Sequence, residues 1–325
     1  EIYTLSLHDA LPICQVILVV GGAGFIGSNL TDALVKNRHQ VVVLDNLSSG
    51  ERKNINPKAN FYKADLRNFK KVESILRKEK PAAIFHLAAQ IDVRKSVEDP
   101  IFDAEINILS SLNLINLAHK YKTKKFIFSS SGGAIYGDTD DRPTREDHPE
   151  QPLSPYGIGK LTIDKYLNYF YRVHGFKYAS LRYANVYGPR QNYKGEAGVV
   201  AIFINKMLAG EQPVINGDGK QTRDYVFVDD IVRANLMALR NLNKVGVYNI
   251  GTGVETNVNE LFQNINQHFG NGFKEKHGPT KLGEQKTSSL NARKIKLEFG
   301  WKPTVKLKAG IKTTVNWFRN NAKIN

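Results

Sequence analysis

The chain has 325 residues, which is enough for about two domains. Hydrophobic residues make up 41% and charged residues 24% of it, an ordinary globular composition that excludes disordered and collagen-like chains. No apolar run approaches the roughly 18 residues that a membrane span needs, so we expect no membrane partner and a cytoplasmic location. A single cysteine, Cys14, and the lack of a His-Glu-x-x-His pair predict that there is no disulfide and no metal site.

The net charge of +15 is concentrated near the carboxyl end. Residues 274–325 carry 13 Lys and Arg against 3 Asp and Glu, or +10, which leaves +5 for the rest of the chain. No ladder of aromatic residues is interleaved with these basic residues, as binding of single-stranded nucleic acid would favour. We therefore interpret them as a solvated face, part of which an anionic small substrate can use, and expect no nucleic-acid partner.

In chain order, residues 1–13 have neither the basic start nor the apolar stretch of a secretory signal, and they do not resemble the start of a domain. We interpret them as a non-native leader. Beyond them, short apolar runs alternate with segments of helical spacing. The runs predict strands at Val16–Val20, Val41–Leu44, Asn60–Lys63, Ala83–Leu87, Phe126–Ser129 and Tyr178–Arg182. The segments predict helices at Phe25–Lys36, Phe69–Glu79, Ile101–Lys120 and Pro155–His174.

Uniformly apolar strands separated by helices are typical of a parallel sheet covered on both faces, so we predict an α/β, doubly wound (Rossmann) domain. We expect this domain to span residues 14–190. After residue 190 the pattern is less regular, which predicts a smaller α/β lobe made of residues 191–224 and 253–325. Residues 225–252, with a strand at Val226–Val228 and a helix at Asp229–Arg240, are expected to return to the first domain.

Three glycines, Gly21, Gly24 and Gly27, lie directly between the first predicted strand and the first predicted helix. Gly21 permits a tight turn, Gly24 lets a pyrophosphate approach the backbone, and Gly27 lets the helix pack close to the strand. The phosphates would lie at the start of the helix, beside Phe25 and Ile26, where free N–H groups favour an anion. The alternative, a P-loop, needs a Gly-Lys-Ser/Thr sequence, and this loop has no lysine.

Asp45 ends the second predicted strand, 18 residues after Gly27. This is close to the spacing of the carboxylate that holds an adenosine ribose, and a carboxylate there repels a 2′-phosphate, so the pattern predicts NAD rather than NADP. The alternative is that Asp45 and Asn46 only open a turn. Asp65 and Leu66, which follow the third predicted strand, are placed to take the adenine amino group.

Tyr156 and Lys160 are four residues apart and share one face of a predicted helix. A phenol with a pKa of about 10 is a poor base. A lysine ammonium and a cationic nicotinamide beside it would lower that pKa and suit the tyrosine to remove a proton from a sugar hydroxyl. The alternative is the exposed start of an amphipathic helix, because this spacing often arises by chance.

Three hydroxyls, Ser129–Ser131, lie at the end of the strand predicted to begin at Phe126. Open α/β sheets bind ligands at the carboxyl ends of their strands, where a serine can hydrogen-bond a reacting oxygen. A serine-rich turn without a chemical role is the alternative.

Together these motifs resemble the extended short-chain dehydrogenase/reductase family, and within it the nucleotide-sugar epimerases of the UDP-glucose 4-epimerase type. The resemblance covers about residues 15–320. It rests on motifs that occur in order: Gly21–Gly27, Asp45-Asn46, His86–Ala89, Ser129–Gly137, Tyr156 with Lys160, Leu181–Arg190, Gly217–Tyr225 and Tyr248–Gly253.

The resemblance implies an NAD-dependent 4-epimerase of UDP-sugars that works through a transient 4-keto sugar. Tyr156 would be the base, Lys160 its tuner and a ligand of the nicotinamide ribose, and Ser131 the hydroxyl partner. Ser130 is the fallback, because an extra glycine separates Ser131 from Tyr136. The further cofactor contacts that it implies are Leu87, Ala88, Ala89, Asn107 and Tyr183. The further substrate contacts are Asn185, Val199, Arg223, Lys281 and Ser288.

Related activities stay open at this point. Dehydratases of the family place an Asp-Glu pair after the catalytic hydroxyl and decarboxylating relatives a glutamate, whereas Gly132 and Gly133 follow Ser131 here, which favours an epimerase. A UDP-glucuronate 4-epimerase, or another nucleotide-sugar dehydratase or reductase, is an alternative. A non-catalytic NAD-binding protein would be expected to lack Tyr156 or Lys160.

Three further expectations follow from the resemblance. The small Ser288 predicts that UDP-N-acetylhexosamines are accepted besides UDP-hexoses. Lys281 stands where the family has arginine, so it keeps the charge without the guanidinium fork. The long predicted helices Ile101–Lys120 and Pro155–His174 pair across a two-fold axis in this family and predict a homodimer.

Overall fold

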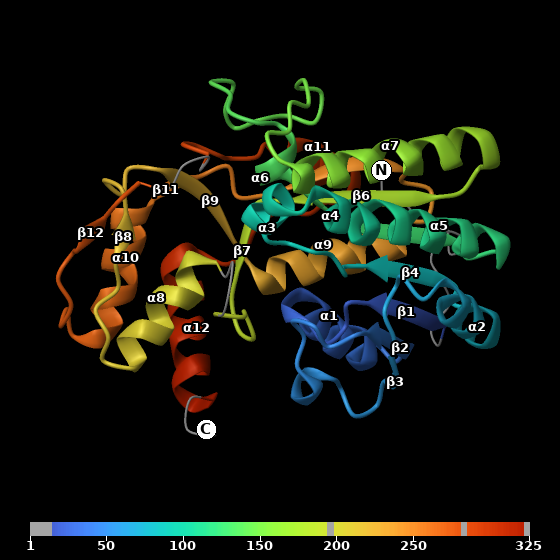
Figure 1. Cartoon of the computed structure of the whole chain (residues 1–325), viewed down its shortest axis with the longest axis horizontal. Coiled ribbons are helices and arrows are strands. Elements are labelled where there is room, and N and C mark those ends of the chain that lie inside the picture. The colour runs from blue at the N-terminus through green and yellow to red at the C-terminus, as the bar shows by residue number, and fades with distance from the viewer. Residues whose placement is uncertain (1–14, 194–197, 281–284, 322–325) are drawn as a thin grey trace, which may run out of the picture.

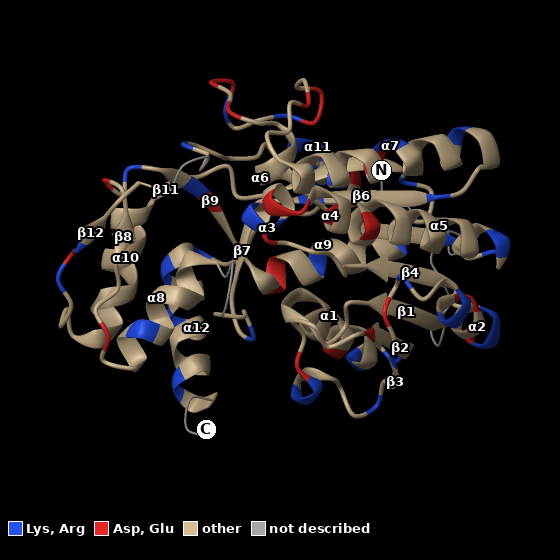
Figure 2. Ribbon diagram, in the orientation of Figure 1, with Lys and Arg blue, Asp and Glu red and all other residues tan. Residues whose placement is uncertain are grey.

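The computed structural model describes residues 15–193, 198–280 and 285–321. Figure 1 shows a sheet with helices along it and, beside it, a smaller group of helices and short strands. Within the described ranges, no helix is long and apolar enough to cross a membrane. Figure 2 shows Lys and Arg on many elements of both parts in this view, which agrees with a solvated basic surface. The expectation of no nucleic-acid partner stays a prediction.

A seven-stranded sheet forms the centre of the larger part. Its strands lie in the order β10-β6-β5-β4-β1-β2-β3, and all neighbouring pairs are parallel. This arrangement confirms the predicted doubly wound fold. The strands are β1 (Val16–Val20), β2 (Gln40–Asp45), β3 (Asn60–Lys63), β4 (Ala83–His86), β5 (Lys125–Ser131), β6 (Tyr178–Tyr183) and β10 (Gly246–Ile250).

Helices cover both faces of the sheet, which explains why its strands are apolar without alternation. Within β1, Ile17 and Val19 face one buried core, and Leu18 and Val20 face the other. The first core packs under α1 (Phe25–Lys36), α9 (Val228–Arg240) and α11 (Arg293–Phe299). The second packs under α2 (Phe69–Glu79), α5 (Ser110–Lys120) and α7 (Pro155–His174).

The helix predicted over Ile101–Lys120 is present, but a π turn lies within it. Two short helices, α3 (Val93–Glu98) and α4 (Pro100–Ala104), are followed by a π-helical turn, η2 (Glu105–Leu109), before α5 begins. Asp99 starts α4 by accepting a hydrogen bond from the N–H of Phe102 (2.9 Å). The π turn keeps a helical pattern of side chains while adding one residue, so periodicity could not reveal it.

The smaller part has its own core, formed by α8 (Val199–Leu208), α10 (Val258–Asn266) and α12 (Leu307–Asn321). They pack on a three-stranded sheet of β7 (Asn185–Tyr187), β9 (Thr222–Phe227) and β11 (Glu255–Asn257). A two-stranded sheet joins β8 (Ile215–Asn216) to β12 (His277–Gly278). The remaining short elements are η1 (Arg52–Asn54), α6 (Gly132–Ile135) and η3 (Gln267–Phe269).

The strand predicted at Val226–Val228 does not return to the large sheet. Those residues end β9 and begin α9, and β9 pairs with β7 and β11 of the small sheet. The elements that do return are α9, which packs on α1, and β10, which pairs with β6. The other domain limits stay predictions, and residues 1–13 lie outside the described ranges.

Lys125, the first residue of β5, has a fully buried side chain. Its Nζ donates hydrogen bonds to the main-chain oxygens of Asn241 and Lys244, which lie beyond the end of α9. Burial, together with the charge of Lys177, lowers the pKa of Lys125 to about 7. The side chain thus links β5 to the chain just beyond α9. The free energy required to bury it depends on whether it is charged, and therefore on pH.

We expect the free energy of unfolding, relative to that of a Lys125→Met variant, to rise between about pH 7 and about pH 10. The unfolded lysine keeps its proton up to about pH 10.4, whereas the folded one loses it near pH 7, so the unfolded state binds more protons in this window. The rise is at most about 1.4 kcal/mol per pH unit. Urea unfolding of both proteins at several pH values measures it, and a constant difference would contradict the low pKa.

Candidate active site

The loop between β1 and α1 leaves no room for side chains at two of its glycines. Gly21 has a φ of +83°, and a Cβ on it would lie 2.6 Å from the main-chain nitrogen of Ala88. A Cβ on Gly27 would lie 2.1 Å from the carbonyl oxygen of Gly21, so only glycine lets α1 begin this close to β1. Gly24 precedes α1 and offers no side chain to cap its amides, so the first turn, from Phe25, can receive an anion.

Asp45 lies beside this loop, at the end of β2. Its carboxylate accepts hydrogen bonds from the N–H groups of Ala23 (3.0 Å) and Leu47 (2.8 Å). A ribose-binding carboxylate is expected in this place, next to the glycines that receive the pyrophosphate. Asn46, the next residue, donates from Nδ2 to Asp65 Oδ2 (3.0 Å) and so links the ends of β2 and β3.

Asp65 is engaged by the protein's own chain. Arg67 donates to both of its carboxylate oxygens, from Nε to Oδ1 and from Nη2 to Oδ2, each at 3.0 Å. This hydrogen-bonded pair lowers the pKa of Asp65 well below its usual range. Leu66 is buried in one core and Ile26 packs against the other, so only the main-chain groups of these two residues can face a cofactor.

Ser131, Tyr156 and Lys160 meet at the carboxyl end of β5. Ser154 caps α7 by accepting a hydrogen bond from the N–H of Gly157 (3.2 Å), which places Tyr156 in the first turn of the helix. The Ser131 side chain lies close enough to the Tyr156 phenol to help lower its pKa. Lys160 Nζ donates to the carbonyl oxygen of Ser129 (2.8 Å) and lies 5.7 Å from the centre of the Tyr156 ring.

The two candidate serines, Ser130 and Ser131, have different neighbours in the structure. Ser130 Oγ donates to Asp164 Oδ2 (3.2 Å), inside the protein, whereas Ser131 is the one that reaches Tyr156. The geometry therefore favours Ser131 as the hydroxyl partner.

The pKa of Tyr156 is raised to about 12, not lowered as the sequence argument expects. Burial is the main cause, opposed by the hydrogen bond with Ser131 and assisted by the charge of Asp103. Burial also lowers the pKa of Lys160 to about 8, against the charges of Asp164 and Asp103. Since the expected lowering depended partly on a cationic nicotinamide, it applies only to the enzyme with its cofactor bound.

Asn107 lies in η2 and binds the chain that leaves β4. Its Oδ1 accepts a hydrogen bond from the N–H of Gln90 (3.0 Å), and its Nδ2 donates to the Gln90 carbonyl oxygen (2.9 Å) and to Asp103 (2.9 Å). Gln90 directly follows the half-buried segment of Leu87, Ala88 and Ala89. The asparagine thus fixes the segment that passes the glycine loop, and its contact with the cofactor stays a prediction.

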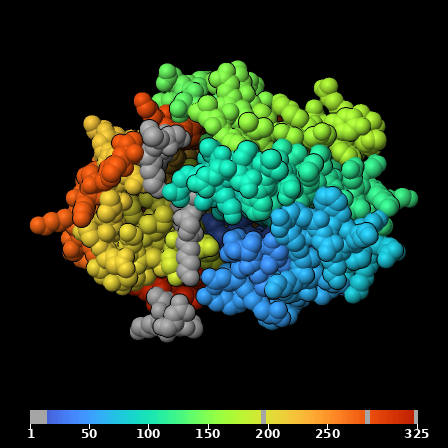
Figure 3. Space-filling view, viewed as in Figure 1, coloured from blue at the N-terminus to red at the C-terminus, as the bar shows by residue number. Residues whose placement is uncertain are grey.

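The two glycines after Ser131 have different surroundings. A Cβ on Gly132 would lie 2.3 Å from Cδ1 of the buried Leu290. Among the described residues, a Cβ on Gly133 would meet nothing nearer than Asn185 Oδ1 and Ser288 Oγ, both at 3.9 Å. Two predicted substrate residues, Asn185 and Ser288, thus lie together beside Gly133, at van der Waals distance from an added methyl carbon. Figure 3 shows a hollow between the two parts of the molecule.

Arg223 lies along the segment that leads to Ser288, because its Nη1 donates to the carbonyl oxygens of Thr222 (2.8 Å) and Lys286 (3.4 Å). Tyr183 is buried, and its hydroxyl exchanges hydrogen bonds with Asn235 of α9. This hydroxyl thus ties β6 to α9, and the cofactor contact expected of Tyr183 stays a prediction. Val199 is the first residue of α8, and Lys281 lies outside the described residues.

Asp224 has a role that the sequence analysis does not assign. Its buried carboxylate accepts hydrogen bonds from the main-chain N–H groups of Thr252 (2.9 Å), Gly253 (2.9 Å) and Leu290 (3.2 Å). It therefore fixes the turn after β10 against the segment that holds Ser288. One signal was available: Asp224 is a lone acid at the start of the apolar run Tyr225–Val228.

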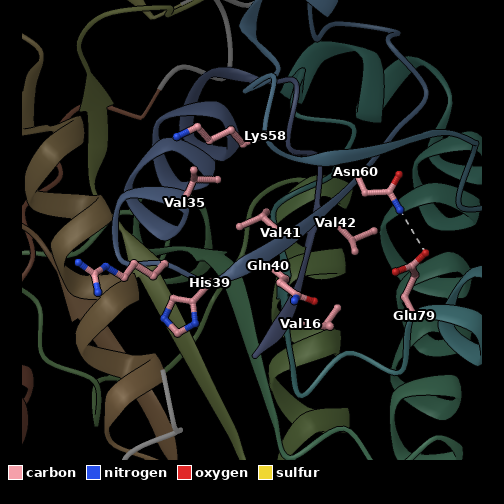
Figure 4. A pocket seen from close by; sticks show the side chains of 10 residues that line it. Val16, Val35, His39, Gln40, Val41, Val42, Lys58, Asn60 and Glu79 are labelled. Carbon is pink, nitrogen blue, oxygen red and sulfur yellow. Dashed lines mark hydrogen bonds between the residues drawn. The ribbon is translucent and has the colours of Figure 1, made fainter. Parts of the chain in front are cut away.

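A surface cavity of about 370 Å³ lies at the opposite edge of the sheet, where β1, β2 and β3 begin. Figure 4 shows Val16, Gln40 and Asn60 around it, with a hydrogen bond from Asn60 Nδ2 to Glu79 (3.2 Å). None of the predicted site residues lines this cavity. The predicted residues gather instead at the carboxyl ends of the strands, where open α/β sheets bind their ligands.

Comparisons with known proteins agree with this geometry. The chain is 43% identical over 311 residues to the UDP-glucose 4-epimerase of Mycolicibacterium smegmatis, covering 94% of this chain and 99% of that protein. A crystal structure of UDP-glucose 4-epimerase from Thermotoga maritima with UDP-glucose has a TM-score of 0.92 and 48% identity. Another, from Thermus thermophilus in complex with NAD, has a TM-score of 0.88 and 39% identity. Each alignment covers 94% of this chain and 99% of the crystallised one.

A family model matches most of the chain as well. The model is that of the NAD dependent epimerase/dehydratase family, and the match spans residues 17–251. This range includes the glycine loop, Asp45 and the Ser131, Tyr156 and Lys160 cluster. The chain therefore belongs to the NAD-dependent epimerase/dehydratase family.

Proposed function

We propose that this protein is a nucleotide-sugar 4-epimerase that interconverts UDP-glucose and UDP-galactose. The observation that carries the proposal is the cluster of Ser131, Tyr156 and Lys160 at the same sheet edge as the glycine loop. The activity named for the relatives supports the choice of substrate and of reaction.

The residues of the glycine loop fit NAD. Gly21 and Gly27 leave a backbone cradle that a Cβ would fill, and α1 begins without a side-chain cap. Asp45 adds a carboxylate beside that cradle, which suits ribose hydroxyls and repels the 2′-phosphate of NADP. These groups would hold the adenosine and pyrophosphate, and Lys160 would bind the nicotinamide ribose.

The proton chemistry falls to Tyr156. Bound NAD⁺ would supply reversible hydride transfer at C4 of the sugar, with no net oxidation over the cycle. Tyr156 removes the proton of the C4 hydroxyl, and Ser131, which lies beside the same phenol, holds the oxygen of the resulting 4-keto sugar. The positive charge of Lys160 stabilises the phenolate that must form in this buried place.

Epimerisation requires the keto sugar to present its other face before Tyr156 gives the proton back. In this proposal Asn185 and Arg223 would hold the diphosphate while the sugar turns about its linkage. We propose that tight binding of the nucleotide and loose binding of the sugar make this turn possible.

The surroundings of Gly132 and Gly133 favour an epimerase over a dehydratase or decarboxylase. A side chain at position 132 would meet Leu290, and position 133, which does face open space, has no acid to remove water or protons from the sugar. Ser288 is small and borders the same space, which supports the acceptance of a UDP-N-acetylhexosamine as well.

The decisive test is incubation of the purified enzyme with a panel of UDP-sugars, without added NADH, followed by NMR of the products. We expect UDP-glucose and UDP-galactose to interconvert with no net change in NADH absorbance, and UDP-GlcNAc to react as well. Turnover of UDP-glucuronate alone, or loss of water from a substrate, would contradict the proposed reaction. Reaction of UDP-glucose without UDP-GlcNAc would reject only the role of Ser288.

We expect a Tyr156→Phe variant to lose epimerisation by about 10²–10⁴-fold, because the general base is removed while the fold is kept. Its content of bound NAD, measured after denaturation, should remain close to that of the wild type. A Ser130→Ala variant, which changes the neighbouring serine, should lose much less activity than Ser131→Ala. A Tyr156→Phe enzyme that still epimerises would exclude Tyr156 as the base.

The homodimer predicted from the sequence stays a proposal, and exposed apolar side chains support it. Ile101 of α4 is 74% exposed, and Leu109 of η2 and Ile158 and Tyr169 of α7 are exposed as well. The three elements contact one another, so these side chains lie on adjoining helices. Burying such a surface against a second copy would remove it from water. The cytoplasmic location also remains a prediction.

We expect sedimentation equilibrium to show a dimer, and an Ile101→Asp, Ile158→Asp double variant to sediment as a monomer or with a much larger dissociation constant. The matched control is Leu297→Asp on α11, a residue that is equally exposed (73%) but lies on a different helix. A monomeric wild-type enzyme at micromolar concentration would contradict the proposal.

A further inference from the structure

We propose that Asp164 is a positioning residue that keeps the buried Lys160 in its charged form. The proposal gives a function to the buried ion pair of Asp164 and Arg182. In the mechanism above, neither residue of this pair holds the cofactor or touches the substrate. The inference rests on the proposed function in one respect only, namely that the charge of Lys160 is needed for catalysis.

Asp164 and Lys160 share one face of α7. They are four residues apart, so their side chains lie one above the other along the helix. Both are buried, with relative exposures of 2% for Asp164 and 4% for Lys160. A charge in such surroundings is costly unless an opposite charge or several hydrogen bonds accompany it.

The Asp164 carboxylate is held in place from two neighbouring strands. It accepts hydrogen bonds from Ser130 Oγ of β5 (3.2 Å), from Ser180 Oγ of β6 and from Arg182 Nε of β6 (2.9 Å). Burial raises the pKa of Asp164, and the charge of Arg182 and the three hydrogen bonds act in the opposite direction. Paired with Arg182, Asp164 supplies a negative charge one helical turn from the lysine.

Arg182 completes the network without approaching the reacting groups. Its guanidinium also donates to the Tyr136 hydroxyl (2.8 Å) and to Glu150 Oε1 (2.8 Å). Replacing a buried ion pair by apolar residues is often neutral or stabilising, so stability alone is a weak reason for this pair. A second buried charge beside it, that of Lys160, supplies a better reason.

The groups that face Lys160 come from several elements. From α7 these are Tyr156 and Asp164, from β5 the Ser129 carbonyl oxygen at 2.8 Å, and from α4 Asp103. His86, at the end of β4, is a neutral neighbour, because burial and the charge of Lys160 lower its pKa to about 3. Among the described residues named here, the two carboxylates are therefore the groups that counter the ammonium charge.

Asp103 lies across α7 from Asp164. It is buried, and its Oδ2 would be 3.6 Å from a Cβ placed on Gly159, the residue before Lys160. Its other oxygen, Oδ1, accepts hydrogen bonds from Gln90 Nε2 (3.0 Å) and Asn107 Nδ2 (2.9 Å). Because Asp103 also faces Tyr156, removing its charge would change two groups at once, which makes Asp164 the cleaner residue to test.

The pKa values agree with this reading of the geometry. Burial lowers the pKa of Lys160 to about 8, and the charge of Asp164 acts in the opposite direction. Removing that charge lowers the pKa of Lys160 further. Lysine is charged below its pKa, so the ammonium would then be lost at a lower pH and activity would decline earlier on the alkaline side.

The test is a ¹³C NMR titration of lysine Cε in the NAD-loaded enzyme, with the Lys160 signal identified by its absence in Lys160→Met. We expect an Asp164→Asn variant to lower the titration midpoint of Lys160 by about one pH unit or more, a tenfold change in proton affinity. The alkaline limb of the pH profile of kcat should move by the same amount. An Asp164→Glu variant should restore part of both shifts.

Asp164→Asn leaves Arg182 buried with one carboxylate fewer, and the variant risks failing to fold. The double variant Asp164→Asn, Arg182→Met removes both charges and is expected to lower the Lys160 midpoint in the same direction. The matched control is Glu150→Gln, which removes the other carboxylate bound to Arg182 and should leave the Lys160 midpoint within about 0.3 pH units, a twofold change in proton affinity.

An unchanged Lys160 midpoint in both Asp164 variants would overturn the proposal, even if their activity were lost, because Asp164 would then serve the structure alone. A shifted midpoint with an unshifted kcat profile would support the role of Asp164. The unshifted kcat profile would, however, contradict the premise that the proposed reaction needs a charged Lys160.

Discussion

The proposed reaction depends on keeping one positive charge, that of Lys160, in a place with little water. Burial favours loss of the proton from Lys160, so the fold surrounds its Nζ with the Ser129 carbonyl oxygen, the ring of Phe128 at 4.8 Å and nearby carboxylates. These groups come from β5, α4 and α7. The strands and helices must therefore be fixed relative to one another before the lysine can act on Tyr156, which explains why so many polar contacts join them.

Most of the larger part could be predicted from the sequence. The helices Phe25–Lys36 and Pro155–His174 have the predicted limits, because Gly24 and Ser154 mark where each begins and apolar spacing marks the buried face. The chain around Asn107 could not be predicted, since a π turn preserves the helical pattern while shifting one hydrogen bond. The partner strands of β9 could not be predicted either, because an apolar run does not show which sheet it joins.

The candidate site likewise contains residues that could be predicted from the sequence and residues that could not. The glycine loop, Asp45 and the Tyr156-Lys160 pair could be predicted because each is a local motif with its own chemistry. The role of Asp164 could not be predicted, and that of Asp224 had only one local signal, since each acts through partners that come from distant segments of the chain. The direction of the Tyr156 pKa was missed for a related reason: the effect of burial depends on the packed protein and is not visible in a four-residue spacing.

Gly133 matters to this site because it has no side chain. With no side chain there, the nearest described groups would stay 3.9 Å away even from an added methyl carbon, whereas its neighbour Gly132 is pressed against Leu290. A ring that must flip over during each turnover sweeps out more volume than it fills at rest. In the proposed reaction, the space left by the missing side chain of Gly133 would then determine how bulky a sugar ring can turn over in the site.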